Sequence, residues 1–443
     1  MHDHTKNEYK ANSITLVGAV AMGTGVMIGA GIFALTGQIA QLAGPMFPFA
    51  FVLGAAITGF SAYSYIRMSN AWPSSGGIAM ILERCYGRGA IAAGASLLMA
   101  FSMVIAESLV ARTFATYLLR PFDIDGGPLV PVLAVSVILF AYLVNAAGNR
   151  SIGLVSAIMA AIKVGGIAMF GLAALWSGGG GLAAASDTGQ SHGLGGFLAS
   201  IALAILAFKG FTTITNSGAE VTDPHRNVGR AIVISIFVCV LLYLLVAFGV
   251  GASLTLDQII VARDYSLAEA AEPALGQAGF LLTILLAVTA TASAVLASVF
   301  AVSRMLAMLT DMKMIPHSHF GMSGPVQRHT LVYTVVIASL LAVFFDLGRI
   351  ASLGAFFYLV MDMAVHYGVW RFRRKEIGAN GLVLLSALGL DGIVLAAFTL
   401  FKLKMDPAIV VIAAIAITAV FVLERLFLPR WIAPAQKDAP GAS

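Results

Sequence analysis

The chain has 443 residues, of which 59% are hydrophobic and 11% are charged, and its formal net charge is +5 at pH 7. Soluble domains carry about 25% charged residues, so this composition excludes a soluble protein. Together with a mean hydropathy of +0.93, it indicates a protein that crosses a membrane repeatedly. The two cysteines, Cys85 and Cys239, fall in a predicted cytoplasmic loop and a predicted helix, so we expect no structural disulfide.

The N-terminal stretch from Met1 to Lys10 is polar and lacks the apolar stretch and cleavage site of a removable signal peptide. We therefore expect residues 1–13 to form a cytoplasmic tail. His2 and His4 lie in this tail, and the predicted spans hold no His/Cys cluster with zinc spacing, so we expect neither a metal nor a cofactor. The chain also lacks a phosphate-binding glycine loop and a nucleophile–base set in a span, so we expect neither ATP-driven transport nor an enzyme.

Twelve apolar segments reach the length of ~20 residues that a membrane-spanning helix needs. We predict one transmembrane domain, residues 14–430, followed by a cytoplasmic tail at residues 431–443. The longer connections Ser177–Gly196 and Leu254–Pro273 are expected on the outside, the second with a short amphipathic helix. The segments begin near Ile14, Met46, Ala90, Leu129, Ile152, Gly195, Val228, Gly276, Leu331, Ile350, Gly381 and Ala408.

The positive charges are distributed unequally across this topology. Most of the 26 Lys and Arg residues fall in loops, helix ends and tails assigned to the cytoplasm. Because cytoplasmic loops carry an excess of Lys and Arg, we expect both termini in the cytoplasm. The net charge thus follows the membrane topology and does not indicate a nucleic-acid partner. The outside receives Arg120, Arg263, Arg349, Lys402 and Lys404, and the spans hold Arg112, Lys163 and Lys209.

The first apolar segment contains three glycines within residues 25–33, Gly-Val-Met-Ile-Gly-Ala-Gly-Ile-Phe. Each glycine in a helix interior costs about 1 kcal/mol relative to alanine. In lipid, backbone groups freed from a helix need protein, water or a ligand as partners. The stretch is therefore either a face for close helix packing or a binding site.

A second break lies in the sixth segment, at residues 208–218, where Phe-Lys-Gly-Phe leads into a polar, β-branched run. Ser and Thr side chains can satisfy backbone groups that leave a helix. Interrupted helices at corresponding positions of two halves are typical of an inverted-repeat transporter with a site at the membrane midplane. The second break therefore favours the binding-site interpretation of residues 25–33.

Residues 25–33 resemble the first-helix signature of the amino acid–polyamine–organocation (APC) superfamily, in which a small-residue triplet precedes Ile-Phe. Residues 218–232 resemble the segment that follows this family's sixth helix. The similarity extends in the family's order along nearly the whole chain. Residues 298–304, with the following stretch up to Ile315 and Pro316, resemble the end of the family's eighth helix. Residues 351–355 resemble the start of its tenth helix.

Residues 26–30 and 214–216 are similar to the sodium-independent, proton-coupled amino acid transporters of this superfamily. The resemblance implies an all-α integral membrane protein of twelve transmembrane helices, built as a five-plus-five inverted repeat with discontinuous helices 1 and 6. The repeats would cover about residues 14–176 and 195–375, with residues 381–428 as peripheral helices. It also implies a permease of the cell (inner) membrane that moves amino acids with protons. A polyamine, an ethanolamine-like amine or an inorganic cation as substrate, or amino acid exchange, remain alternatives on the same fold.

The resemblance places the substrate between the two breaks. Its carboxylate would meet backbone N–H groups of residues 28–31, because the N-terminus of a half-helix favours an anion. Its ammonium would meet carbonyls around Val26 and Phe208, and Phe211 is the candidate aromatic gate, with ordinary helix packing as the alternative. The implied substrate-binding residues are Val26, Ile28, Gly29, Ala30, Gly31, Phe208, Lys209, Gly210 and Phe211.

Lys163 lies near the middle of the fifth span, where a charged side chain costs at least ~2.5 kcal/mol. Snorkelling of the side chain to an interface is one interpretation. In the proton-coupled branch, a fifth-helix lysine occupies the place of a bound cation, next to positions that match Gly25 and Ser293. The resemblance therefore implies that Lys163 couples transport to protons by bridging to Gly25 and Ser293.

Glu107 in the third span and Lys209 at the sixth-helix break depart from that branch, which is apolar at both positions. Helix 3 passes beside this break in the family fold. We therefore expect the two side chains to form an ion pair, because two lone buried charges would each be costly. Such a pair either shapes the substrate pocket and proton path or is structural only.

Three other acidic residues have open interpretations. Asp362 and Asp391 lie in late spans, where each could be a helix cap, an interhelical pair or a peripheral proton site. Glu220 follows the sixth-helix break, and we expect it to join Arg226 and Arg230 in a salt-bridge gate at the inner side.

Overall fold

The computed structural model describes residues 12–124, 126–146, 152–177, 193–314 and 326–432. The predicted tails, residues 1–13 and 431–443, lie almost entirely outside these ranges. Within them the chain is helical, and the β pairing is limited to an isolated bridge between Ile14 and Val221. The predicted all-α fold is therefore confirmed.

Ten helices among the described residues are long and apolar enough to cross a membrane, and two shorter apolar helices accompany them. The predicted number of twelve spans, and the repeat boundaries, therefore stay predictions. In chain order the helices are α1 (Leu16–Met27), α2 (Phe33–Ala43), α3 (Phe47–Ala71), α4 (Gly77–Tyr86), α5 (Ala90–Leu119), α6 (Leu129–Ala146), α7 (Ile152–Ser177), α8 (Gly193–Phe208), α9 (Thr212–Asn216), α10 (Pro224–Ser253), α11 (Leu256–Val261), α12 (Ser266–Asp311), α13 (Val326–Phe344), α14 (Leu347–Gly368), α15 (Gly381–Met405) and α16 (Pro407–Ile432).

Local sequence signals fix several helix ends. The Thr15 side chain accepts a hydrogen bond from the Gly18 N–H at the start of α1, and Asp346 does the same for the Arg349 N–H at the start of α14. Thr255 forms a capping box with Gln258 at the start of α11. These side chains satisfy N–H groups that a helix leaves free in its first turn.

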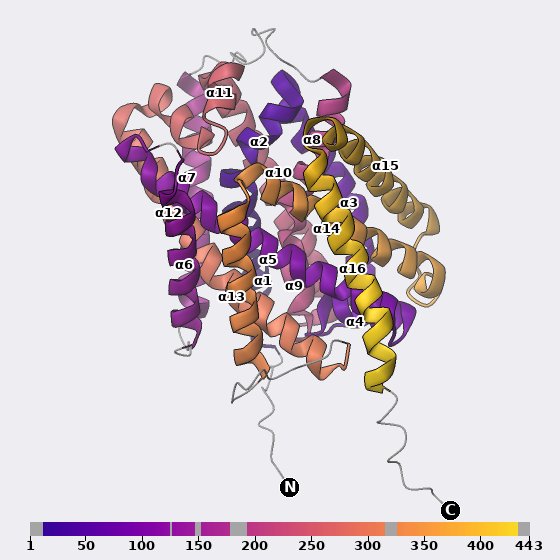
Figure 1. Cartoon of the computed structure of the whole chain (residues 1–443). Helices are drawn as coiled ribbons and strands as arrows, with labels where there is room; N and C mark the ends of the chain where they lie inside the picture. Colours follow the sequence, from indigo (N-terminus) through magenta and orange to yellow (C-terminus); the bar gives the residue numbers. More distant parts are fainter. Residues whose placement is uncertain (1–11, 125, 147–151, 178–192, 315–325, 433–443) are drawn as a thin grey trace, which may run out of the picture.

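The long helix α12 bends at Gly276, whose φ of 67° and ψ of −167° are not helical. Only glycine adopts this conformation readily. The bend separates a short helical segment from the membrane-spanning part of α12, as expected for the polar connection before Gly276. Figure 1 shows α11 and α4 at opposite ends of the helix bundle, in agreement with their assignment to opposite sides of the membrane.

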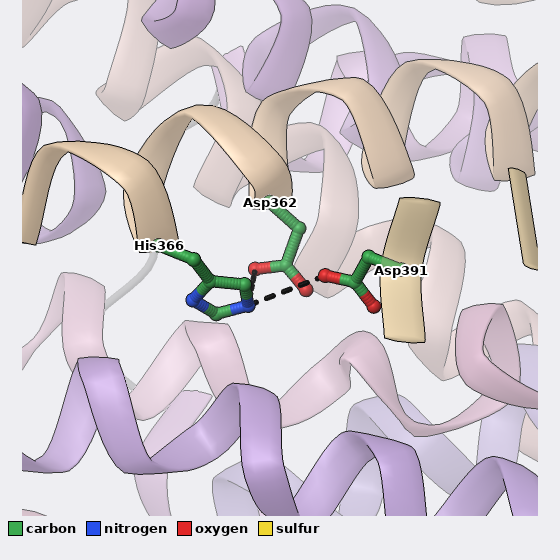
Figure 2. Close-up of side chains that lie close together, drawn as sticks. All are labelled: Asp362, His366 and Asp391. Atoms are coloured by element: carbon green, nitrogen blue, oxygen red, sulfur yellow. Dashed lines mark ion pairs between the residues drawn. The ribbon is translucent and has the colours of Figure 1, made fainter. Parts of the chain in front are cut away.

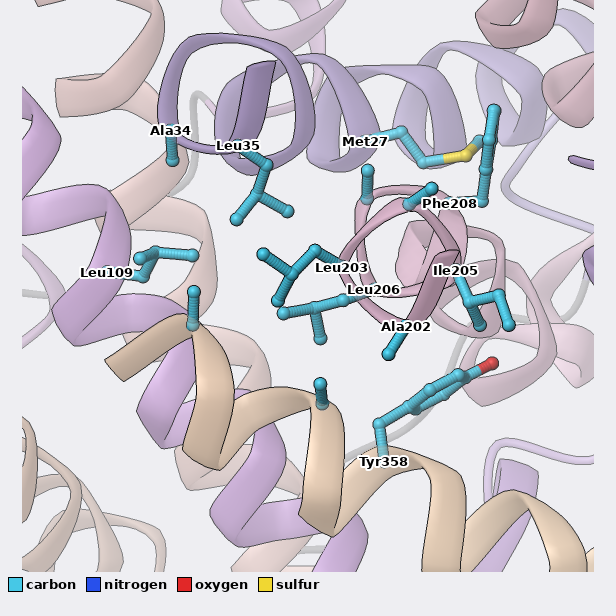
Figure 3. Packing of buried hydrophobic residues seen from close by; sticks show 14 of the residues in the cluster. Met27, Ala34, Leu35, Leu109, Ala202, Leu203, Ile205, Leu206, Phe208 and Tyr358 are labelled. Carbon is cyan, nitrogen blue, oxygen red and sulfur yellow. The ribbon is translucent and has the colours of Figure 1, made fainter. Parts of the chain in front are cut away.

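Two hydrophobic clusters hold the bundle together. The larger one surrounds α8, whose span is 83% buried, whereas α16 is only 17% buried. Figure 3 shows Leu203 and Leu206 of α8 directed toward the side of Leu109 of α5, and Tyr358 of α14 beside Ala202 and Ile205 of α8. The second cluster joins α5, α6, α12 and α13 through apolar residues that include Val104, Val110, Ala111, Ala134, Ile138, Val295, Val299, Val335 and Ala338.

Candidate functional site

The break in the first span is a π-helical turn, Ile28–Ile32, between α1 and α2. The backbone stays helical through it: Ile28 has φ −66° and ψ −35°. A π turn widens the hydrogen-bond ring and is frequent at functional sites. The chain therefore does not unwind in this conformation. The Ile28 N–H, which the resemblance assigned to a substrate carboxylate, donates to the carbonyls of Thr24 and Gly25 instead.

The break in the sixth span is a 3₁₀ turn, Lys209–Phe211, between α8 and α9. The Thr212 hydroxyl donates to the Lys209 carbonyl at 2.8 Å, which satisfies one backbone group that the turn frees. A Cβ added at Gly210 would lie 2.7 Å from the backbone nitrogen of Met27. The two breaks thus touch each other, and the glycine permits this close approach.

Tyr243 of α10 links the two breaks, and the sequence analysis missed it. Its hydroxyl donates to the Met27 carbonyl at 2.6 Å and lies 3.1 Å from the Ala207 carbonyl. The residue is fully buried, and its ring lies 4.8 Å from that of Phe208. A tyrosine within an apolar span needs a partner for its hydroxyl, and this was the signal that the sequence offered.

Two glycines of residues 25–33 serve close packing in this conformation. A Cβ at Gly31 would lie 2.2 Å from the Tyr243 hydroxyl, and one at Gly29 would lie 2.7 Å from the Ala294 Cβ on α12. Gly25 differs, because a Cβ there would meet no atom within 4 Å. The packing interpretation of this stretch therefore applies to Gly29 and Gly31 in this conformation, whereas Gly25 borders open space.

Lys163 is buried, with 5% of its surface exposed, and lies on α7. Helix α7 packs against α1 and α12, which carry Gly25 and Ser293. Among the described residues no hydrogen bond joins Lys163 to Gly25 or Ser293, and the Ser293 hydroxyl donates to the Ala290 carbonyl of its own helix at 2.9 Å. The structure thus brings the three helices together and leaves open space next to Gly25.

The expected ion pair between Glu107 and Lys209 is absent from the described residues. The Lys209 ammonium donates to the backbone carbonyl of Ser102 at 2.7 Å and to its hydroxyl at 2.9 Å. Ser102 and Glu107 both lie on α5 but are five positions apart, which is nearly one and a half turns. Lysine and glutamate therefore face different sides of this helix, and the prediction of a direct pair is wrong for this conformation.

Glu107 faces the second cluster. Val104 and Ala111, three and four positions away on α5, both belong to it. Glu107 is fully buried, and neither carboxylate oxygen has a hydrogen-bond partner within the described part of the chain. An unpaired charged acid in an apolar environment is costly, so this environment favours the protonated, neutral form of Glu107.

Phe211 is fully buried in this conformation. Its ring stacks edge-on against Tyr65 of α3, with 5.3 Å between ring centroids. The Glu220 carboxylate forms an ion pair with Arg304 of α12, so the predicted partners Arg226 and Arg230 are corrected to Arg304. Asp362 and Asp391 form an interhelical cluster with His366 of α14.

The region around the two breaks is closed. Ile28, Phe208 and Phe211 are fully buried, and Met27 is 1% exposed. Two pockets on the described part lie elsewhere, one beside Asn70 and His225 and the other beside Arg120 and Tyr265. The conformation is therefore one in which the two interrupted helices contact each other directly.

Comparison with known proteins identifies the family. Residues 14–433 match the model of the amino acid permease family. The chain is 30% identical to the inner membrane transport protein YbaT of Escherichia coli, over 83% of this chain and 86% of the relative. It is 27% identical to the branched-chain amino acid permease BcaP of Lactococcus lactis, over 81% of each chain.

A plant relative, the mitochondrial cationic amino acid transporter 3 of Arabidopsis thaliana, is 25% identical over 79% of this chain and 60% of the relative. The match to the family model covers nearly the whole transmembrane domain. It agrees with the resemblance to the APC superfamily and with the many apolar helices. The chain therefore belongs to the amino acid permease family and is a multi-pass membrane transporter, not an enzyme.

Proposed function

We propose that this chain is a secondary active transporter that moves amino acids with protons across the cell (inner) membrane. It works by alternating access around the two interrupted helices, with both termini in the cytoplasm. The observation that carries the proposal is the direct contact of the two breaks, where Gly210 lies against Met27 and Tyr243 binds carbonyls from both.

In this proposal the substrate separates the breaks and replaces contacts that they make with each other. The amino acid carboxylate binds N–H groups of residues 28–31, where the π turn can release them. The ammonium binds carbonyls near Val26 and Phe208. These positions adjoin the Met27 and Ala207 carbonyls that Tyr243 occupies in the closed state.

Protons couple to this movement through Lys163. Its helix α7 packs against α1, which leads into the first break, and against α12. A protonated lysine that reaches toward Gly25 and Ser293 favours one arrangement of these helices, and a neutral lysine favours the other. A proton thus shifts the equilibrium by its different affinity for the two states.

The deciding experiment is uptake into proteoliposomes that contain the purified chain, under an inward proton gradient. We expect accumulation of an amino acid that collapses when a protonophore removes the gradient. Competition by a panel of amino acids and amines identifies the substrate class. Inhibition by amines but by no amino acid would overturn the substrate assignment. Accumulation that does not depend on the proton gradient would overturn the proposed proton coupling.

A further inference from the structure

Three side chains with metal-binding atoms converge where α14 meets α15. Asp362 and His366 are four positions apart on α14 and so share one face of the helix, and Asp391 reaches them from α15. All three are fully buried. Figure 2 shows the imidazole of His366 directed between the two carboxylates.

The two distances from the His366 imidazole to the carboxylates match the spacing of ligands on one ion. The Nε2 atom of His366 lies 3.4 Å from Asp362 Oδ1 and 3.3 Å from Asp391 Oδ2. Direct hydrogen bonds between such atoms measure about 2.7–3.2 Å, whereas ligands held tetrahedrally at ~2.0–2.1 Å from one metal ion are ~3.4 Å apart. The Nε2 atom and both Asp391 oxygens have no hydrogen-bond partner within the described part of the chain.

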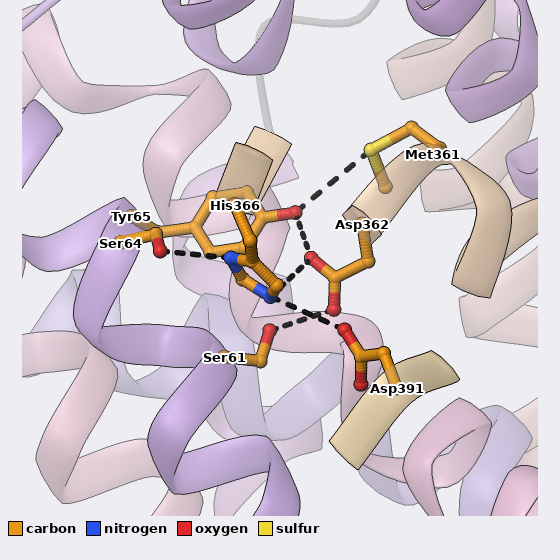
Figure 4. Close-up of polar contacts among 7 residues, drawn as sticks. All are labelled: Ser61, Ser64, Tyr65, Met361, Asp362, His366 and Asp391. Atoms are coloured by element: carbon orange, nitrogen blue, oxygen red, sulfur yellow. Dashed lines mark hydrogen bonds and ion pairs between the residues drawn. The ribbon is translucent and has the colours of Figure 1, made fainter. Parts of the chain in front are cut away.

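Neighbouring hydroxyl groups hold these side chains in position. The Tyr65 hydroxyl donates to Asp362 Oδ1 at 2.5 Å, and the Ser61 hydroxyl donates to Asp362 Oδ2 at 2.7 Å. Ser64 Oγ lies 2.8 Å from Nδ1 of His366, the ring nitrogen that faces away from the carboxylates (Figure 4). Metal-binding histidines and carboxylates are ordinarily oriented by hydrogen bonds of this kind.

The charge of the cluster is also suited to a cation. Two carboxylates and a neutral imidazole carry two negative charges, and a buried charge needs compensation. Among the ion pairs of the described residues, none joins a Lys or Arg to Asp362 or Asp391. Protons alone neutralise the cluster only if His366 and one carboxyl are both protonated. A metal ion bound to all three side chains would replace these protons, because metal ligands bind in their deprotonated forms.

We propose that Asp362, His366 and Asp391 bind one transition-metal dication of the zinc class. Imidazole and carboxylate together suit zinc or manganese, whereas Mg²⁺ and Ca²⁺ prefer oxygen ligands alone. Because the three ligands are fully buried, the ion enters as the helices assemble and stays during transport. It fastens the outer helix α15 to α14, and the proposal is independent of the transported substrate.

The test uses the full chain, purified with an affinity tag that contains no histidine, from cells grown with added zinc. We expect elemental analysis to find about one zinc ion per chain and the cobalt-grown protein to show the visible absorption of a tetrahedral site. In Asp391→Asn and His366→Gln the metal content falls at least ~10-fold, and Ser64→Ala weakens metal affinity by roughly 10–100-fold.

Glu107→Gln is the matched control, because it also removes a buried carboxylate without a partner but lies away from the cluster. It keeps the full metal content. Wild-type protein that contains no stoichiometric metal, and whose unfolding temperature changes with neither zinc nor a chelator, overturns the proposal. This result is read from the wild-type chain, so a variant that fails to fold does not affect it. Equal metal content in wild type and His366→Gln also overturns the proposal.

Discussion

The two breaks and the Asp362–His366–Asp391 cluster stabilise buried polar groups in different ways. Both place polar groups inside a membrane protein, where an unpaired group costs several kcal/mol. At the breaks the polar groups belong to the backbone, and Tyr243 and Thr212 satisfy carbonyls with neutral hydrogen bonds. In the cluster they are charged side chains whose spacing leaves room for a cation.

The difference concerns what each region can do. Neutral backbone hydrogen bonds are each worth only about 0.5–1.5 kcal/mol net, so a substrate can replace them as the helices move. A buried set of charges resists separation, because removing one partner exposes the others to an apolar environment. The breaks are therefore suited to movement, and the cluster is suited to holding α14 and α15 together.

The largest expected effect on stability comes from His366→Leu, measured with a chelator present so that metal does not contribute. This change leaves two buried carboxylates without a cationic partner, and we expect it to lower the free energy of unfolding by about 3–5 kcal/mol. Asp391→Asn is the control, because it leaves Asp362 beside His366, and its effect should be clearly smaller. Equal losses in denaturation of the detergent-solubilised variants would contradict this account of the cluster.

Gly210→Val tests whether the breaks need close contact. The Cβ of the added side chain would lie 2.7 Å from the Met27 backbone nitrogen, which is too close for an unstrained contact. Overpacking of this kind costs about 1–3 kcal/mol. We expect a lower unfolding temperature and loss of uptake into proteoliposomes. Gly59→Ala on α3 is the matched control, because a Cβ there meets no atom within 4 Å. Normal uptake by Gly210→Val would show that transport tolerates separated breaks.

Tyr243→Phe removes one hydroxyl and leaves the buried carbonyls of Met27 and Ala207 without this donor. We expect a loss of about 1–3 kcal/mol in stability together with a changed apparent affinity for substrate, since the closed state loses its link. Tyr117→Phe is a suitable control, because that buried hydroxyl has no partner within the described residues. If both variants behave alike in denaturation and uptake, the Tyr243 link does not hold the breaks together.

Lys163→Ala should have the smallest effect on stability, because the Lys163 ammonium forms no ion pair among the described residues. Its effect on function should be selective. We expect counterflow of substrate without a gradient to persist while accumulation driven by a proton gradient disappears, as measured in proteoliposomes. Full gradient-driven accumulation in this variant would contradict the role of Lys163.

The sequence predicted the class of fold well, for physical reasons. Apolar segments must be helical in lipid, because no water satisfies their backbone groups, and the described residues are helical as expected. Glycines mark both breaks, because close approach of backbones at Gly210 excludes a larger residue. The form of the breaks, a π turn and a 3₁₀ turn, was not predictable, since neighbouring helices decide which carbonyls find partners.

The contacts of charged residues were predicted less well. Both Glu107 and Lys209 are buried, as expected, but Lys209 binds Ser102. Which side chains can pair depends on the face of α5 from which each one projects. A difference of a few positions along a helix can rotate that direction by more than a right angle. The same limit applies to Asp362 and Asp391, whose common partner His366 becomes apparent only once α14 and α15 are packed together.

The sequence by itself determined that this chain crosses the membrane many times, has breaks in its first and sixth spans, and resembles amino acid transporters. These properties follow from composition and from the cost of glycine and charge in lipid, which act locally along the chain. Only the tertiary structure decided that Tyr243 joins the two breaks and that an imidazole lies between two carboxylates. Such contacts depend on side chains from distant segments, and the packing of helix faces alone brings them within a few ångströms of each other.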